Sequence, residues 1–96
     1  MPDGFVDSGG RDNAASGTEL GLTSTSTIVT SVVIRAKKAN TGTIHIGKSD
    51  VSTSKPGLSA GEAIKVNAKE AFDLADTFFD ASVSGEGIEY WYNLVQ

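Results

Sequence analysis

The stretch that decides the fold runs from Ser26 to Lys38 and reads STIVTSVVIRAKK. It is rich in β-branched residues, and its apolar and polar positions alternate, which is typical of a β-strand with one buried face. The face expected to be buried carries Val32, Ile34 and Ala36. Arg35 and Lys37 point to the opposite face, so we expect them at the surface.

Similar patterns continue along the chain. A turn signal at residues 40–42 predicts a hairpin loop into a strand at residues 43–47, in which His45 points outward. Further alternating runs predict strands at residues 63–68, 74–83 and 88–95. Turn signals recur at intervals of about 8–12 residues, so the sequence predicts an all-β fold, a sandwich or small barrel of about six or seven short strands.

The composition limits the classes of partner. The sequence has no cysteine and one histidine, which excludes disulfides and thiolate metal sites. Its formal net charge is −4 at pH 7, and no cluster of basic residues exceeds Lys37-Lys38, so we expect no nucleic-acid partner. No apolar run is long enough to span a bilayer, so we expect no membrane partner either.

Candidate catalytic and metal-binding residues are few. His45 is the only imidazole, and no Ser near it forms a recognisable nucleophile motif, so we expect neither enzymatic activity nor a cofactor. Four carboxylates near loops could bind Ca²⁺, namely Asp73, Asp76, Asp80 and Glu86. They lack the loop pattern of alternating ligands that a calcium site of the EF-hand type requires, so we interpret them as solvated and predict no metal site.

The last predicted strand divides its aromatic residues between two faces. The face expected to be buried carries Ile88, Tyr90, Tyr92 and Leu94. Trp91 lies on the other face with Glu89 and Asn93, and a Trp in that position suits a subunit interface. Phe78 and Phe79 are adjacent and must also point to opposite faces. We predict Phe79 and Trp91 as subunit-interface residues, the alternative being that both faces are covered within one chain.

The order of several motifs resembles a known family. These motifs are Val32-Val-Ile-Arg-Ala36, Asn40-Thr-Gly42, Ile44-His-Ile-Gly47, Gly61-Glu62, Asp73-Leu74 and Gly87-Ile-Glu-Tyr-Trp-Tyr92. From about Ser31 to Leu94 the chain resembles capsid decoration (cement) proteins of tailed bacteriophages, which are small β-sandwich virion proteins. The resemblance implies a small antiparallel β-sandwich of jelly-roll or Greek-key type without enzymatic activity. It also implies a homotrimer at the capsid surface of the virion, with the major capsid protein shell as its partner.

The first residues of the chain differ from the rest in composition. Residues 1–17 read MPDGFVDSGGRDNAASG and cannot bury enough apolar surface to offset an ordering cost of about 1–2 kcal/mol per residue. We therefore predict an extended, flexible N-terminal arm at residues 1–17 and a β-sandwich domain at residues 18–96. With the resemblance, this implies an arm that orders on a neighbouring subunit or on the shell through Phe5, Val6 and Arg11. A frayed terminus is the alternative.

Two other functions are compatible with the sequence. A carbohydrate-binding β-sandwich module would use Trp91 as a stacking platform, with Glu89 and Asn93 binding sugar hydroxyls. A head–tail or tail structural protein would have the same fold and would differ only in its docking surface. The resemblance favours the decoration protein.

Overall fold

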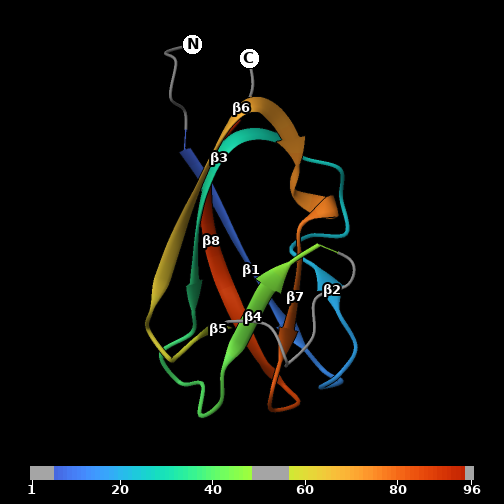
Figure 1. The fold of residues 1–96 in the computed structure, drawn as a ribbon, viewed down its shortest axis with the longest axis vertical. Coiled ribbons are helices and arrows are strands. Elements are labelled where there is room, and N and C mark those ends of the chain that lie inside the picture. The colour runs from blue at the N-terminus through green and yellow to red at the C-terminus, as the bar shows by residue number, and fades with distance from the viewer. Residues whose placement is uncertain (1–5, 49–56, 95–96) are drawn as a thin grey trace.

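The computed structural model describes residues 6–48 and 57–94. Within these ranges the chain forms two four-stranded sheets that pack against each other (Figure 1). The long sheet contains, in spatial order, β1 (Val6–Asn13), β8 (Glu86–Leu94), β3 (Ile28–Ala36) and β6 (Ala63–Asp73). The short sheet contains, in spatial order, β2 (Leu20–Gly21), β7 (Phe78–Ala81), β4 (Ile44–Gly47) and β5 (Gly57–Leu58). A 3₁₀ turn, η1 (Leu74–Asp76), lies between β6 and β7.

The strand order is that of a jelly roll. β1 pairs with β8, β2 with β7, β3 with β6 and β4 with β5, as in one long hairpin folded across two sheets. The pairs β3–β8 and β4–β7 complete the sheets, and every pair is antiparallel. The predicted all-β antiparallel sandwich is therefore confirmed, with eight strands in the described ranges.

The core lies between the two sheets and is built from alternate positions of their strands. From the long sheet it contains Val29, Val32, Ile34, Ala36, Ile88 and Tyr90, which include the three predicted inward positions of β3. Of the positions predicted inward in the last strand, Ile88 and Tyr90 are buried, Tyr92 is half-buried against the core, and the side chain of Leu94 lies outside the described residues. From the short sheet and the segments next to it come Leu22, Ile44, Leu74, Phe79 and Ala81. The alternation visible in the sequence therefore marks the buried faces of β3 and β8.

The structure corrects the prediction of a separate N-terminal arm at residues 1–17. Val6–Asn13 forms β1, which is in register with β8 from Val6 opposite Asn93 to Asn13 opposite Glu86. Residues 6–13 therefore belong to the sandwich, and the division between an arm and a domain does not fall at residue 17. Residues 1–5, including Phe5, lie outside the described residues.

β1 has few apolar residues, and it is accommodated because β8 supplies the apolar contact through the ring of Tyr90. A Cβ added at Gly9 would lie 2.7 Å from the hydroxyl oxygen of Tyr90, so the glycine leaves room for the tyrosine ring. Arg11 joins the two sheets, since its Nη1 donates a hydrogen bond to the carbonyl oxygen of Gly21 in β2 at 3.0 Å. The order of β1 thus rests on pairing with a neighbour, and not on apolar side chains of its own.

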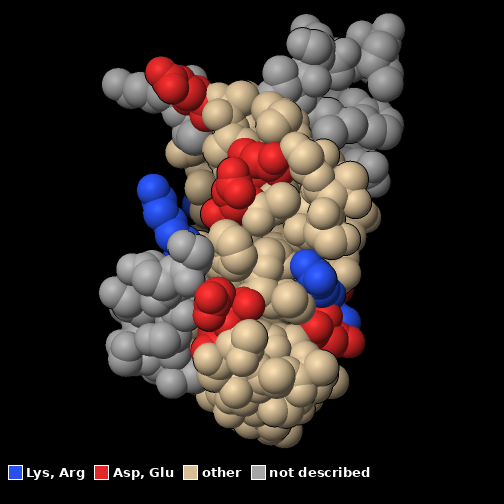
Figure 2. Space-filling view, turned by 90° about the vertical axis from the view of Figure 1, so that its right-hand side faces the viewer, with Lys and Arg blue, Asp and Glu red and all other residues tan. Residues whose placement is uncertain are grey.

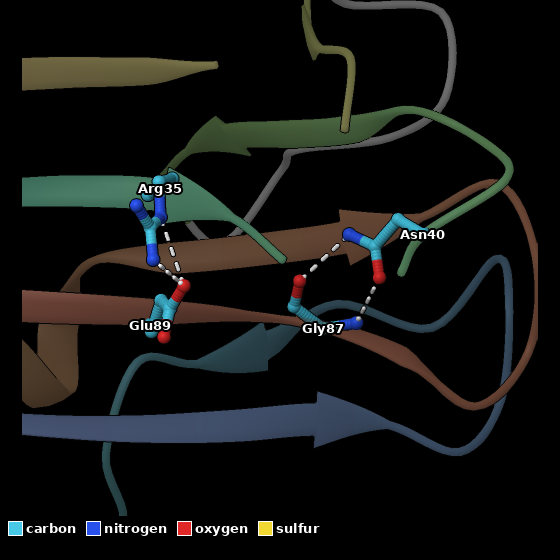
Figure 3. A network of polar contacts seen from close by, with 4 residues as sticks. All are labelled: Arg35, Asn40, Gly87 and Glu89. Carbon is cyan, nitrogen blue, oxygen red and sulfur yellow. Dashed lines mark hydrogen bonds and ion pairs between the residues drawn. The ribbon is translucent and has the colours of Figure 1, made fainter. Parts of the chain in front are cut away.

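The connection between β3 and β4 differs from the predicted hairpin. β3 lies in the long sheet and β4 in the short sheet, so residues 37–43 cross from one sheet to the other. The Asn40 side chain contacts the end of β8, where its Nδ2 donates to the carbonyl oxygen of Gly87 at 2.8 Å (Figure 3). The Glu86 carboxylate accepts from the N–H groups of Thr41 at 2.6 Å and Gly42 at 2.8 Å. These bonds fasten the crossing segment to β8.

Candidate binding face around Trp91

The outer face of the long sheet presents side chains in cross-strand rows. Trp91 of β8 lies between Ser8 of β1 and Val33 of β3, and Lys65 of β6 lies beyond Val33. The neighbouring rows pair Glu89 with Arg35 and Asn93 with Ser31. We call this surface the Trp91 face and define it by Ser31, Val33, Arg35, Lys65, Glu89, Trp91 and Asn93.

The Trp91 ring is held by the neighbouring row. The guanidinium carbon of Arg35 lies 5.3 Å from the centroid of the Trp91 ring, within the range of a cation–π interaction. Arg35 is itself fixed by Glu89, whose Oε1 accepts a hydrogen bond from Arg35 Nε at 2.8 Å and forms an ion pair with Nη2 (Figure 3). Trp91 nevertheless stays 37% exposed. The ring is therefore oriented before any partner arrives.

A shallow hollow of about 150 Å³ adjoins the ring, lined by Ser31, Val33, Lys65, Trp91, Tyr92 and Asn93. Its lining combines an aromatic surface with an amide, a hydroxyl and an ammonium group. Asn93 Nδ2 donates to Ser31 Oγ at 3.2 Å, which orients the two polar side chains relative to each other. The hollow can thus contact both a flat apolar surface and polar groups beside it.

The two predicted interface residues have different environments. Trp91 lies on the outer face of β8, as the alternation predicts, and its role as an interface residue stays a prediction. Phe79 is fully buried in the core, so the prediction that it contacts another subunit is wrong. Phe78, its neighbour in β7, takes the outward position opposite Gly47. The sequence analysis placed Phe78 and Phe79 on opposite faces, but it selected Phe79, the buried residue of the two, as the interface residue.

The residues predicted to bind a partner through the arm are placed within the same chain. Arg11 is bonded to Gly21 across the two sheets of its own chain, and its role in binding a partner stays a prediction. Val6 is the first residue of β1 and the register partner of Asn93. The prediction for Phe5 lies outside the described residues.

Asp73 has a local structural role. Its carboxylate accepts hydrogen bonds from the Ser26 hydroxyl at 2.5 Å and from the N–H groups of Thr27 and Ala75 at 2.9 Å. These donors, the Ser26 hydroxyl foremost, hold the pKa of Asp73 below its ordinary value. Asp73 caps η1 and ties it to the segment that leads into β3.

The other candidate carboxylates do not converge with Asp73 on one point. The N–H groups of Thr41 and Gly42 lower the pKa of Glu86, at the crossing between the sheets. On the side of the molecule seen in Figure 2, acidic side chains form separate patches divided by uncharged surface. Among residues 6–48 and 57–94, no group of three or more His, Cys, Asp or Glu side chains is placed to hold a metal ion.

Asp80 and His45 are buried polar residues that the sequence did not reveal. Asp80 is 0% exposed, and its Oδ1 accepts a hydrogen bond from the Gly17 N–H at 3.0 Å, while Oδ2 has no hydrogen-bond partner. Its register partner, His45 of β4, is 7% exposed, although it was predicted at the surface. Alternation identified the outer face of the short sheet but could not show that this face is covered, because the cover over Asp80 comes from the loop at Gly17.

Comparisons with known proteins add no relative. No protein-family model, no curated protein and no solved structure matches this chain. Within the described ranges, no helix is long and apolar enough to cross a lipid bilayer. The identification of a function therefore rests on the jelly-roll fold and on the chemistry of the Trp91 face.

Proposed function

We propose that the protein is a structural component of a bacteriophage virion that binds the outside of the capsid and bridges shell subunits. The observation that carries the proposal is the Trp91 ring, exposed on the outer face of a sheet and oriented by Arg35. Trp and Arg are enriched among the residues that dominate binding energy at protein interfaces. The jelly roll is an architecture that viral capsid proteins use, and the sequence resembles phage decoration proteins.

In this proposal the Trp91 face contacts the shell or a sister subunit. Repeated copies, arranged as homotrimers, would bind the shell strongly through multivalency, although each individual contact is modest. A trimer requires a mass near three times 9.9 kDa. Light scattering coupled to size exclusion, over a range of concentrations, measures that mass for the free protein.

The test of the docking surface is cosedimentation with phage shells that lack this protein. Replacing a central aromatic contact by alanine typically costs about 2 kcal/mol or more, so Trp91→Ala should weaken shell binding by roughly 30-fold. Val83→Ala is the matched control, because Val83 is an apolar residue of similar exposure, 40%, outside the Trp91 face. Equal binding of both variants and the unchanged protein would exclude the Trp91 face as the docking surface.

The location on the virion needs a separate measurement. A head–tail or tail protein of this fold would dock through a surface of the same kind. Immunogold electron microscopy of intact virions distinguishes the positions. Label distributed over the head supports the decoration role, whereas label confined to the neck or tail contradicts it.

The second candidate function is carbohydrate binding, which the hollow beside Trp91 favours. Its volume of about 150 Å³ is of the order needed for one sugar ring, and its lining offers stacking surface together with Asn93, Ser31 and Lys65. Jelly rolls also occur as lectin domains. Since Trp91 is the only tryptophan, its fluorescence reports directly on this hollow. A saturable change with soluble glycans that Asn93→Ala abolishes would favour the carbohydrate-binding module over the decoration protein.

A further inference from the structure

From Ser8 onward, β1 contributes no side chain to the apolar core. Among residues 8–19, whose side chains the structure describes, none belongs to the core cluster or packs against it as a partly buried hydrophobic residue. Opposite Tyr90 the strand has Gly9, and opposite Ile88 it has Arg11. Segments with few buried apolar contacts open at lower free energy than the core of the same domain.

The contacts that hold β1 are backbone pairing and polar bonds. Eight register pairs join it to β8. Arg11 donates to the Gly21 carbonyl, and the Asn13 carbonyl accepts from the Gly85 N–H at 2.7 Å. β1 is an edge strand of the long sheet, so no strand on its other side holds it within the described chain.

The segment between β1 and β2 is suited to act as a hinge. Residues 14–19 are all exposed. Its contacts with the short sheet and the loop after it are few, and include Gly17 N–H to Asp80 Oδ1 and Ser16 N–H to Ser84 Oγ, both at 3.0 Å. Gly17 has a φ of +91°, a conformation that glycine adopts at low cost. Release of β1 requires breaking these contacts together with its pairing to β8, the Arg11 bond to Gly21 and the Asp12–Lys37 ion pair.

We propose that β1 is an exchangeable strand, which pairs with β8 of its own chain in the isolated protein and with β8 of a second copy when copies are held side by side. The partner is a second copy because its β1 has the same sequence and therefore fits beside β8, with Gly9 against Tyr90, in the same register. The two pairings contain identical contacts, so the balance between them depends on hinge geometry and on the local concentration of copies. This exchange is independent of what the Trp91 face binds.

The absence of cysteine from the sequence permits a direct test with introduced cysteines. A Cβ at Gly10 would lie 3.9 Å from the Cβ of Glu89, within the range that a disulfide spans. One chain carries Gly10→Cys and a differently tagged chain carries Glu89→Cys, so neither can form this disulfide alone. The two are mixed at millimolar concentration, oxidised with glutathione and analysed for the mixed disulfide by intact mass.

The matched control replaces the second chain by Lys65→Cys, whose cysteine is also exposed on the outer face of the long sheet but lies on β6, the opposite edge strand. Exchange predicts at least a 10-fold higher initial rate of mixed-disulfide formation for the Gly10→Cys and Glu89→Cys pair than for the control pair. Equal rates, which random collision would give, overturn the proposal.

A double variant in one chain, Gly10→Cys with Glu89→Cys, checks the geometry and the mechanism together. It should form an intramolecular disulfide and then stop exchanging β1. Hydrogen exchange of the unchanged protein supplies a further measurement: β1 amides should exchange at least 10-fold faster than β3 amides. Equal protection of the two strands, or failure of the double variant to close while folded, contradicts the proposal.

Discussion

The side-chain amide of Asn40 binds the backbone of Gly87 through both its nitrogen and its oxygen. Its Nδ2 donates to the Gly87 carbonyl oxygen at 2.8 Å, and its Oδ1 accepts from the Gly87 N–H at 3.3 Å (Figure 3). The opposite side of Gly87 lies against β1, where an added Cβ would come within 2.7 Å of the Asp12 α-carbon. A side chain from the crossing between the sheets thus acts as a strand neighbour at the start of β8.

Asn40→Ala should destabilise the fold by about 1–3 kcal/mol, because it removes both side-chain hydrogen bonds to the buried peptide groups of Gly87, whose carbonyl oxygen keeps the Lys37 N–H as a donor. For a domain of this size, that lowers the melting temperature by roughly 4–8 °C for each kcal/mol. Thermal unfolding followed by circular dichroism measures the change. Asn67→Ala, which removes an exposed asparagine of β6, is the control and should shift the melting temperature by no more than a few degrees.

Phe79 and Trp91 should differ sharply in their effect on stability. Phe79→Ala opens a cavity in the core and should cost about 3–5 kcal/mol. Trp91→Ala removes a partly exposed ring and one cation–π contact, and should cost about 1 kcal/mol. Urea unfolding compares the two variants, with Phe79→Leu as a milder substitution if the alanine variant does not fold. A larger loss for Trp91→Ala than for Phe79→Ala would contradict the described environments.

Gly9 and Gly10 provide a second matched pair. Gly9→Ala places a methyl group 2.7 Å from the Tyr90 hydroxyl oxygen and 2.8 Å from two ring carbons, so the ring or β1 must move. Gly10→Ala meets its closest atom, the Ile88 carbonyl oxygen, at 3.2 Å. Gly9→Ala should therefore cost about 1–3 kcal/mol, and Gly10→Ala should cost less. Similar losses of unfolding free energy for the two variants would show that Tyr90 does not set the requirement for glycine.

Stability should fall in acid because of Asp73 and Glu86. Folding lowers the pKa of each carboxyl below the ordinary values of 3.8 and 4.5, so the folded state favours the charged forms. Their stabilising contribution is present above those ordinary values and is lost as the pH falls toward and through the lowered pKa values of the folded state. Melting temperatures from neutral pH to about pH 2.5 measure this loss.

Asp73→Asn and Glu86→Gln are the matched variants for this pH series. Each should melt at a lower temperature than the unchanged protein at neutral pH, because the charged acceptor is gone. Each should also lose less stability between neutral and acid pH. If the melting temperatures of both variants fall between neutral and acid pH as steeply as that of the unchanged protein, Asp73 and Glu86 are not the cause of the acid destabilisation.

The sequence predicted the parts of the fold in which a strand carries its own apolar face. The alternation of Val32, Ile34 and Ala36 marks the buried side of β3, and Tyr90 and Trp91 divide between the faces of β8 as expected. β1 escaped prediction because its apolar contact comes from Tyr90, about 80 residues later in the chain. The residue pattern of one segment cannot reveal a contact that a distant segment supplies.

The same reasoning explains which parts of the candidate site were predictable. The outward position of Trp91 follows from its parity in the strand, but the Arg35 guanidinium near its ring depends on the register between β3 and β8. The residues at 40–42 predicted a hairpin because their turn chemistry is local, whereas the jelly roll uses them to change sheets. Phe79 was misassigned because adjacent phenylalanines give no local indication of which one faces the core.

The pairing of the first described strand with the last has a consequence for how the protein folds during synthesis. Val6 and Asn93 are register partners, so the long sheet cannot be completed until nearly the whole described chain has left the ribosome. Such distant pairing gives a high contact order and slow folding, and an unpaired strand is a hazard for aggregation in the meantime. The composition of β1, VDSGGRDN, lowers the aggregation tendency of this strand while it is unpaired, because polar and glycine residues do not form the apolar β-segments from which aggregates grow. The feature that hid this strand from sequence reasoning also makes β1 itself a poor starting point for aggregation before β8 emerges.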